Sequence, residues 1–150
     1  MKILYTIPFP QGMGADRWIY EGWKRAFIAE GHEFYIHTER DNFEELIKKI
    51  KPNVLFLDGE VLIKGKLMIN SGGLGKPIIS LEGLRERGIK VICQTNIGLD
   101  REKDDDMRVA LFRFNIRFID VLFTNCAPEM AQKLEQLYGH KVYSIPHAAD

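Results

Sequence analysis

The amino-acid sequence predicts an α/β fold: a Rossmann-like three-layer sandwich, with a mostly parallel sheet of about six strands and helices on both faces. Short apolar runs rich in Ile, Val, Leu and Phe recur along the 150 residues. Such runs suit strands that are covered on both faces. Segments of helical period separate the runs, and this alternation is typical of a parallel sheet. We therefore expect residues 1–150 to form a single domain.

Each of the predicted strands is a short apolar run that meets a turn-forming or helical segment at its end. The six strands are Lys2–Ile7, Glu33–His37, Val54–Leu57, Val91–Cys93, Val121–Thr124 and Val142–Ile145. Parallel strands joined through helices should follow right-handed crossovers. The least regular stretch is Gly59–Ile79, which we interpret as a loop with room for a short hairpin.

The first two predicted helices each carry an apolar stripe and a stop signal. The first stripe consists of Trp18, Ile19, Trp23, Ala26 and Phe27. It ends at Gly31, because glycine adopts the left-handed conformation of a helix terminus without a Cβ clash. The second stripe consists of Phe43, Leu46, Ile47 and Ile50, and Pro52 ends it.

Three further helices are predicted in the second half of the chain. A short third helix carries Leu81, Leu84 and Arg87, with Gly88 as its stop. The fourth carries Met107, Leu111, Phe114 and Phe118. These apolar residues are spaced by four, three and four positions, as on one face of a helix. The last begins near Pro128, which a first helical turn tolerates, and carries Met130, Leu134 and Leu137.

The composition argues against several classes of partner. Lys and Arg together number 21, as do Asp and Glu, so the chain has no basic excess for nucleic acid or an anionic membrane. The apolar runs fall short of the roughly 18 residues of a membrane span, and no signal peptide is expected. Cys93 and Cys126 lack the spacing of a zinc site. We expect both to be small, buried, reduced thiols of a cytoplasmic protein.

A ligand of a parallel α/β sheet is expected at the carboxyl ends of the strands. The loop after the first strand contains Gly12, Met13 and Gly14 just ahead of a helix start. Glycines allow backbone N–H groups to approach a ligand closely, and a helix N-terminus favours a phosphate. Arg17 stands where a dinucleotide fingerprint has its third glycine, so a tight turn that merely needs glycine is the alternative. Asp16 has helix N-capping as its alternative role.

Polar residues also follow the later strands. They are Asp58, Gln94, Thr95, Asn96, Asn125 and His147. A hydrolase would need two carboxylates at a defined separation, which the sequence does not specify for Asp16, Asp58 and Asp150. The four histidines are scattered without ligand spacing, and the acidic run 104–106 suits a solvated helix start. We therefore expect no metal site.

Three segments resemble those of a known enzyme family. They are Lys2-Ile3-Leu4-Tyr5 followed by Gln11-Gly12-Met13-Gly14, the junction Glu30-Gly31-His32-Glu33, and the closing stretch Val142–Asp150. In order and spacing they resemble the N-terminal, acceptor-side lobe of GT-B glycosyltransferases, and the spore-maturation type most of all. His147 replaces the usual Asn of the closing "IPNGVD" stretch, and Gln94-Thr95 stands where related enzymes often carry a His.

The resemblance implies a two-lobed enzyme of which residues 1–150 are the N-terminal half. This lobe would bind the acceptor, which is a glycan, lipid or protein. A C-terminal donor lobe, in the same or another chain, would make most contacts with a nucleotide-diphosphate sugar. That sugar is a co-substrate, and no permanently bound cofactor or metal is implied.

The resemblance also suggests roles for particular residues. Gly12, Met13, Gly14 and Arg17 would lie near the donor diphosphate, where backbone N–H groups stabilise the leaving phosphate. The other substrate-binding candidates are Gln94, Thr95, Asn96, Asn125 and His147. Asp16 or Asp58 would act as the base of an inverting enzyme. His147 has a plain alternative as a hinge residue.

Two other functions stay open. One is a free-standing flavodoxin-like binding module without catalysis, which would need an exposed apolar helix face. Trp18, Trp23 or the group Phe112, Phe114 and Phe118 would supply such a face, although aromatic residues of this kind usually belong to the core. The other is a small hydrolase or nucleotide-binding enzyme at the same strand ends.

Overall fold

The computed structural model describes residues 1–6, 15–38, 41–62, 79, 81–100 and 106–146, with the side chains of 15–18 left out. Its strands are β1 (Lys2–Thr6), β2 (Glu33–His37), β3 (Val54–Asp58), β4 (Lys90–Gln94), β5 (Val121–Thr124) and β6 (Val142–Ser144). Its helices are α1 (Ala15–Ala29), α2 (Phe43–Ile50), α4 (Asp106–Asn115), the 3₁₀ turn η1 (Ile116–Phe118) and α5 (Pro128–Tyr138). Each predicted strand is present, with ends shifted by no more than one residue where the structure describes them.

The six strands form one sheet in which every neighbouring pair is parallel. Their order is β2-β1-β3-β4-β5-β6. The chain therefore moves in one direction from β1 to β2, and in the other direction from β3 onwards. This is the flavodoxin-like doubly wound order, extended by a sixth strand. The predicted α/β three-layer architecture is confirmed.

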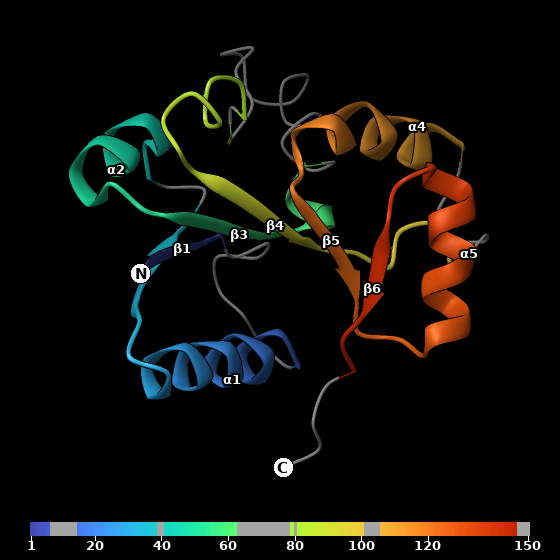
Figure 1. The fold of residues 1–150 in the computed structure, drawn as a ribbon, viewed down its shortest axis with the longest axis horizontal. Coiled ribbons are helices and arrows are strands. Elements are labelled where there is room, and N and C mark those ends of the chain that lie inside the picture. The colour runs from blue at the N-terminus through green and yellow to red at the C-terminus, as the bar shows by residue number, and fades with distance from the viewer. Residues whose placement is uncertain (7–14, 39–40, 63–78, 80, 101–105, 147–150) are drawn as a thin grey trace.

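The helices lie on both faces of the sheet (Figure 1). Among the described residues, α1 is the helix of one face, and its Tyr20, Trp23 and Phe27 pack against the sheet. Buried residues of α2, α4 and α5 share a single cluster on the other face. Alternation along each strand explains the division, because successive side chains point to opposite faces. Phe56 points towards α1, while its neighbour Leu55 points towards the other helices.

Helix α1 ends where the sequence predicts. Gly31 has φ +82°, a left-handed backbone that favours glycine. The N–H of His32 donates to the Phe27 carbonyl at 2.9 Å and the N–H of Gly31 donates to the Ile28 carbonyl at 3.0 Å. These bonds satisfy carbonyl groups that the helix end would otherwise leave open.

The predicted third helix is wrong. Residues 82–88 form a series of turns, although Leu81 and Leu84 are buried as expected. Gly83 has φ +78° and Gly88 has φ +72°, so a left-handed residue interrupts the segment near its start. The prediction of a loop over 59–79 is also wrong at its beginning, because residues 59–62 are helical.

The apolar stripe predicted for the fourth helix is not its buried face. Met107 is 66% exposed and Phe114 is 53% exposed, whereas Phe112 is fully buried. Helix α4 stops at Asn115 and tightens into η1, so the spacing to Phe118 no longer follows one α-helical face. A similar correction applies to α5, which buries Ala131, Leu134 and Tyr138 and leaves Met130 and Leu137 exposed.

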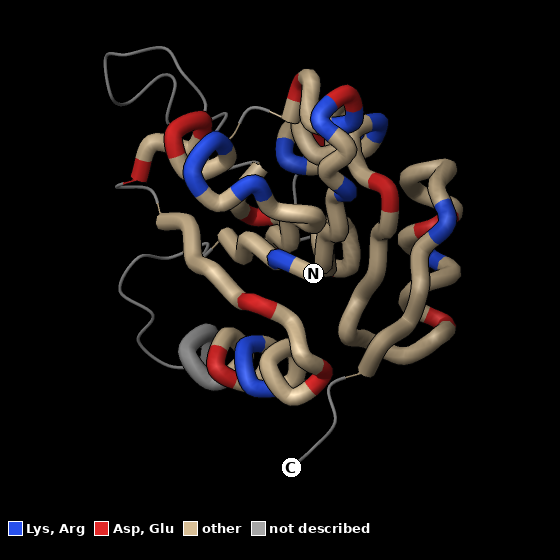
Figure 2. Tube along the Cα trace, turned by 60° about the vertical axis from the view of Figure 1, so that its left-hand side comes forward, with Lys and Arg blue, Asp and Glu red and all other residues tan. Residues whose placement is uncertain are grey.

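Charged residues lie mainly on the helices and turns, with acidic and basic side chains interspersed (Figure 2). In the described part of the chain, no helix has both the length and the apolar character to cross a membrane. Cys93 and Cys126 are both free thiols. Cys93 is buried as predicted, but Cys126 is partly exposed, because it lies beyond the end of β5.

Candidate functional site at the carboxyl edge of the sheet

The carboxyl ends of β3, β4 and β5 bring several predicted residues to one edge of the sheet. Asp58 lies in register with Gln94, and Gln94 lies in register with Phe123. The residues that follow these strands therefore emerge side by side. Gln94 and Thr95 are buried, while Asn96 is exposed and Asn125 partly so.

Asn96 and Asn125 are at the centre of a network of neutral polar groups. The Asn96 Nδ2 donates to the Asn125 Oδ1 at 2.8 Å. The hydroxyl of Thr124 donates to the Asn96 Oδ1, which thereby joins the ends of β4 and β5. The Cys126 Sγ lies 3.6 Å from that same Oδ1 and 3.7 Å from the Asn125 Oδ1. We call these four residues, Asn96, Thr124, Asn125 and Cys126, the amide cluster.

The backbone holds the amide cluster in place. The N–H of Thr95 donates to the Phe123 carbonyl at 2.9 Å, which continues the pairing of β4 with β5 beyond the strand end. The Thr95 hydroxyl accepts from the N–H of Ile97 at 3.1 Å, so this predicted site residue has a structural role. From β6, the Ser144 hydroxyl donates to the Cys126 carbonyl at 2.7 Å. These contacts fix the orientation of groups that protrude from the sheet edge.

The chemistry of the amide cluster is that of hydrogen bonding without charge. Amides and hydroxyls both donate and accept, which matches the hydroxyl groups of a polyol. The Asn125 Nδ2 makes no hydrogen bond within the described residues, and it is therefore a donor available to a ligand. Such a surface orients a ligand but contains no general base of its own.

Asp58 is the carboxylate at the end of β3, in register with Gln94. Its Oδ1 accepts from the N–H of Glu60 at 2.8 Å and so supports the helical residues 59–62. Burial raises the pKa of the Cys93 thiol well above its usual value, and the negative charge of Asp58 raises it further. Cys93 is consequently a protonated, buried thiol rather than a nucleophile.

A partly buried ion pair ties the segment after β3 to α4. One guanidinium nitrogen of Arg108, Nη2, lies 2.7 Å from Glu60 Oε1 and 2.8 Å from Oε2. The two side chains are 21% and 30% exposed, so solvent screens the pair only in part. The pair positions the segment that directly follows Asp58.

A buried pair that the sequence did not predict, Thr6 and His37, lies at the ends of β1 and β2. Thr6 lies in register with His37, and the Thr6 hydroxyl is 3.1 Å from the His37 Nδ1. His37 is fully buried, and its Nε2 has no hydrogen-bond partner among the residues that the structure describes. A histidine that ends an apolar strand, as in Glu33–His37, is the signal that could have identified it.

The stability of the protein is expected to fall as the pH is lowered through the titration of His37. Burial lowers the pKa of His37 below its usual 6.5, an effect that the nearby carboxylate of Asp41 opposes. The unfolded chain therefore binds a proton near pH 6.5 that the folded chain refuses until the pH is lower. Between the lowered pKa of folded His37 and its usual value of 6.5, the free energy of unfolding therefore rises with pH, and this stability is lost on acidification. Urea unfolding at a series of pH values measures this dependence.

The matched variants for this test are His37→Gln and His140→Gln. Removing the buried imidazole should flatten the pH dependence of the unfolding free energy over this window. Replacing His140, which lies in the turn before β6 and hydrogen-bonds the Lys141 carbonyl, should leave the dependence in place. If His37→Gln keeps the slope of the natural chain, another group is responsible.

The remaining predicted site residues lie in α1 or among the residues that the structure does not describe. Asp16 and Arg17 fall within the first turn of α1, so Asp16 is a residue of the helix rather than its preceding cap. Gly12, Met13, Gly14 and His147 lie outside the described residues. The structure thus gathers Asp58, Gln94, Thr95, Asn96 and Asn125, and adds Thr124 and Cys126, which the strand-end pattern did not single out.

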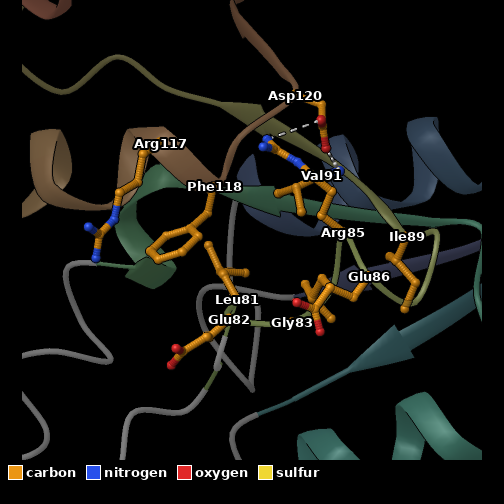
Figure 3. Close-up of a pocket in the computed structure, with 11 residues that line it drawn as sticks. Leu81, Glu82, Gly83, Arg85, Glu86, Ile89, Val91, Arg117, Phe118 and Asp120 are labelled. Carbon is orange, nitrogen blue, oxygen red and sulfur yellow. Dashed lines mark hydrogen bonds and ion pairs between the residues drawn. The ribbon is translucent and has the colours of Figure 1, made fainter.

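A cavity of about 560 Å³ lies on the opposite rim of the sheet, at the amino ends of β4 and β5 (Figure 3). Its lining combines apolar side chains with charged groups of both signs. It is lined by Leu81, Glu82, Gly83, Leu84, Arg85, Glu86, Ile89, Val91, Arg117, Phe118 and Asp120. Asp120 accepts from the N–H of Val91 at 2.8 Å and lies 3.7 Å from the Arg85 guanidinium. None of the predicted site residues lines this cavity.

Within the described ranges, no three His, Cys, Asp or Glu side chains form a group that could hold a metal ion. Comparison with known protein families, with curated proteins and with solved structures finds no match to this chain.

Proposed function

We propose that this chain is the acceptor-binding, N-terminal lobe of a GT-B glycosyltransferase. The enzyme would move a hexose from a nucleotide-diphosphate sugar to a glycan, lipid or protein acceptor. The reaction would take place in a cleft against a C-terminal donor lobe of the same or another chain. The two free thiols suit the cytoplasm as its location.

The observation that carries this proposal is the amide cluster at the carboxyl edge of an all-parallel sheet. This edge is where α/β sheets bind their ligands. A neutral set of amide and hydroxyl groups suits sugar hydroxyls, which likewise donate and accept hydrogen bonds. The resemblance of the first loop and the closing segment to glycosyltransferases adds support that is independent of this geometry.

Roles within the proposal follow from position. The Asn125 Nδ2 and the Asn96 amide would hydrogen-bond the sugar, while Gln94 and Thr95 support them from the strand end. Gly12, Met13, Gly14 and Arg17, with His147, would serve the diphosphate side. Asp58 and Asp16 are the candidate bases of an inverting transfer. Of these two, Asp58 is the one in register with Gln94.

Titration of the chain with UDP-, GDP- and TDP-glucose, followed by amide NMR, tests the proposal. Shifts are expected at residues 58–60, 94–97 and 124–127. Asn125→Ala should weaken binding about fivefold, since one hydrogen bond contributes on the order of 1 kcal/mol. Lys133→Ala, on the exposed side of α5, is the matched control and should bind as the natural chain does.

Glucose and inorganic phosphate, titrated separately, identify which part of the nucleotide sugar is recognised. The proposal expects glucose to shift the amide cluster and phosphate to leave it unmoved. The absence of shifts at the amide cluster with glucose as well as with the three nucleotide sugars would contradict the assignment of this cluster to sugar binding, as would shifts confined to the cavity at the amino ends of the strands.

A second candidate is a flavodoxin-like binding module without catalysis. The strand order 2-1-3-4-5 at the start of the sheet favours it, since that order places a flavin at the switch point between β1 and β3. Quenching of FMN fluorescence by this chain, together with no response to nucleotide sugars, would support the module. Strand order alone does not assign a function.

A further inference from the structure

An exposed apolar stripe runs along α4 and into η1. Met107, Ala110 and Phe114 follow one another at steps of three and four, and all three are exposed. That spacing places them along one side of a helix. Arg117 continues the stripe by a further three residues in η1. Exposed apolar residues that gather on one helix face mark an interaction surface more often than scattered ones do.

Arg117 joins this stripe to the cavity at the amino ends of the strands. Its guanidinium lies 4.6 Å from the ring centre of Phe114 and 4.6 Å from that of Phe118. Phe118 and Arg117 both line the cavity, whose lining includes Leu81 and Val91 (Figure 3). The exposed helix face and the cavity of about 560 Å³ therefore form one continuous surface.

The charges on this surface have an arrangement that selects a partner. No carboxylate of the described residues pairs with Arg113 or Arg117, so the C-terminal end of α4 and η1 are basic, whereas Asp106 lies in the first turn of α4. Arg108, the other arginine of α4, is already neutralised by Glu60. Across the cavity, the segment 81–89 contributes Glu82 and Glu86 to the opposite wall. A partner must therefore present carboxylates towards the C-terminal end of α4 and apolar groups towards the cavity.

We propose that this surface docks an amphipathic helical peptide with acidic residues along one border of its apolar face. Its apolar side chains would cover Met107 and Phe114 and enter the cavity, in the helix-in-groove manner. Its carboxylates would pair with Arg113 and Arg117. The guanidinium of Arg117 lies against the rings of Phe114 and Phe118, which would orient it for a bidentate contact with a carboxylate. The surface lies away from the amide cluster, and its use does not depend on sugar transfer.

The same observations disfavour two other occupants. An anionic membrane would be repelled by Glu82 and Glu86 on the cavity wall, and it would leave the concave surface unfilled. A second copy of the chain, related by a two-fold axis at the stripe, would bring Arg113 and Arg117 towards their own copies.

The test uses a synthetic peptide of about 15 residues with leucine at the i, i+3, i+4 and i+7 positions, glutamate along one border of the leucine face and glutamine at the remaining positions. Amide NMR of the full chain should show shifts over α4, η1 and residues 81–89. Phe114→Ser should weaken binding about tenfold, as expected for an aromatic anchor. Ile28→Ser on α1 is the matched control, because Ile28 is 52% exposed and Phe114 is 53% exposed. It should leave binding unchanged.

Three further measurements decide between the occupants. A peptide with lysine in place of glutamate should bind at least tenfold more weakly than the acidic peptide, and Arg117→Glu should reduce this difference. Sedimentation of vesicles of phosphatidylglycerol and phosphatidylcholine should leave the chain in solution. Equal binding of the two peptides, co-sedimentation with the vesicles, or a dimer that Phe114→Ser dissociates would each overturn the proposal.

Discussion

Replacing Phe56 by alanine is expected to lower the free energy of unfolding by about 3–5 kcal/mol. Phe56 is 2% exposed and lies at the centre of the cluster beneath α1. Its ring centre is 5.0 Å from that of Tyr5 and 5.2 Å from that of Trp23, both in edge-to-face geometry. Phe27 and Phe123 complete the surroundings at 6.0 and 5.9 Å. Urea unfolding followed by circular dichroism measures the loss.

The cost is large because no neighbour can fill the space that the ring leaves. Phe56 lies on a central strand between β1 and β4, and rigid aromatic rings surround it. The matched control is Phe114→Ala, which removes the same ring from a 53% exposed position. It should cost less than about 1 kcal/mol, mainly from the contact with Arg117. Equal losses for both variants would contradict the assignment of Phe56 to the core.

The strands were predictable because a parallel sheet covered on both faces requires continuous apolar runs. Val54–Asp58, with four buried residues in succession, is the clearest example. The helices were less predictable, because apolar spacing alone does not reveal which face is buried. Leu81 and Leu84 had helical spacing, yet the left-handed Gly83 between them turns the segment away from a helix. Phe114 fitted a stripe with Met107, but α4 buries the face that carries Phe112 and Asn115, so the stripe is exposed.

The location of the candidate site followed from topology, whereas its composition required the register. The strand-end rule placed Asn96 and Asn125 on one edge, and they are hydrogen-bonded to each other. Thr124 joins them because its hydroxyl points along the edge, which depends on the pairing of β5 with β4. The cavity at the opposite rim combines the segment 81–89 with η1. No pattern in the sequence relates these two segments.

Gly59→Ala is expected to lower the free energy of unfolding by about 1–3 kcal/mol, as overpacking does in a well-filled core. A Cβ at this position would lie 2.9 Å from Phe112 Cε2, 2.9 Å from Thr95 Oγ1 and 3.1 Å from Ile97 Cδ1. Each of these neighbours is buried, so none can move aside without disturbing the core. The end of β3 can therefore approach Thr95 this closely only because Gly59 has no side chain.

Gly22→Ala, in the middle of α1, is the matched control. A Cβ there meets nothing within 4 Å. Alanine should stabilise the helix by about 0.5–1 kcal/mol, because glycine loses more backbone entropy on folding. The two glycine substitutions should thus have opposite signs in urea unfolding. Displacement of Thr95 by Gly59→Ala should also shift the amide signals of its neighbour Asn96. Stabilisation by both substitutions would show that the strand ends are less closely packed than these distances require, and the amide cluster would lose its rigid support.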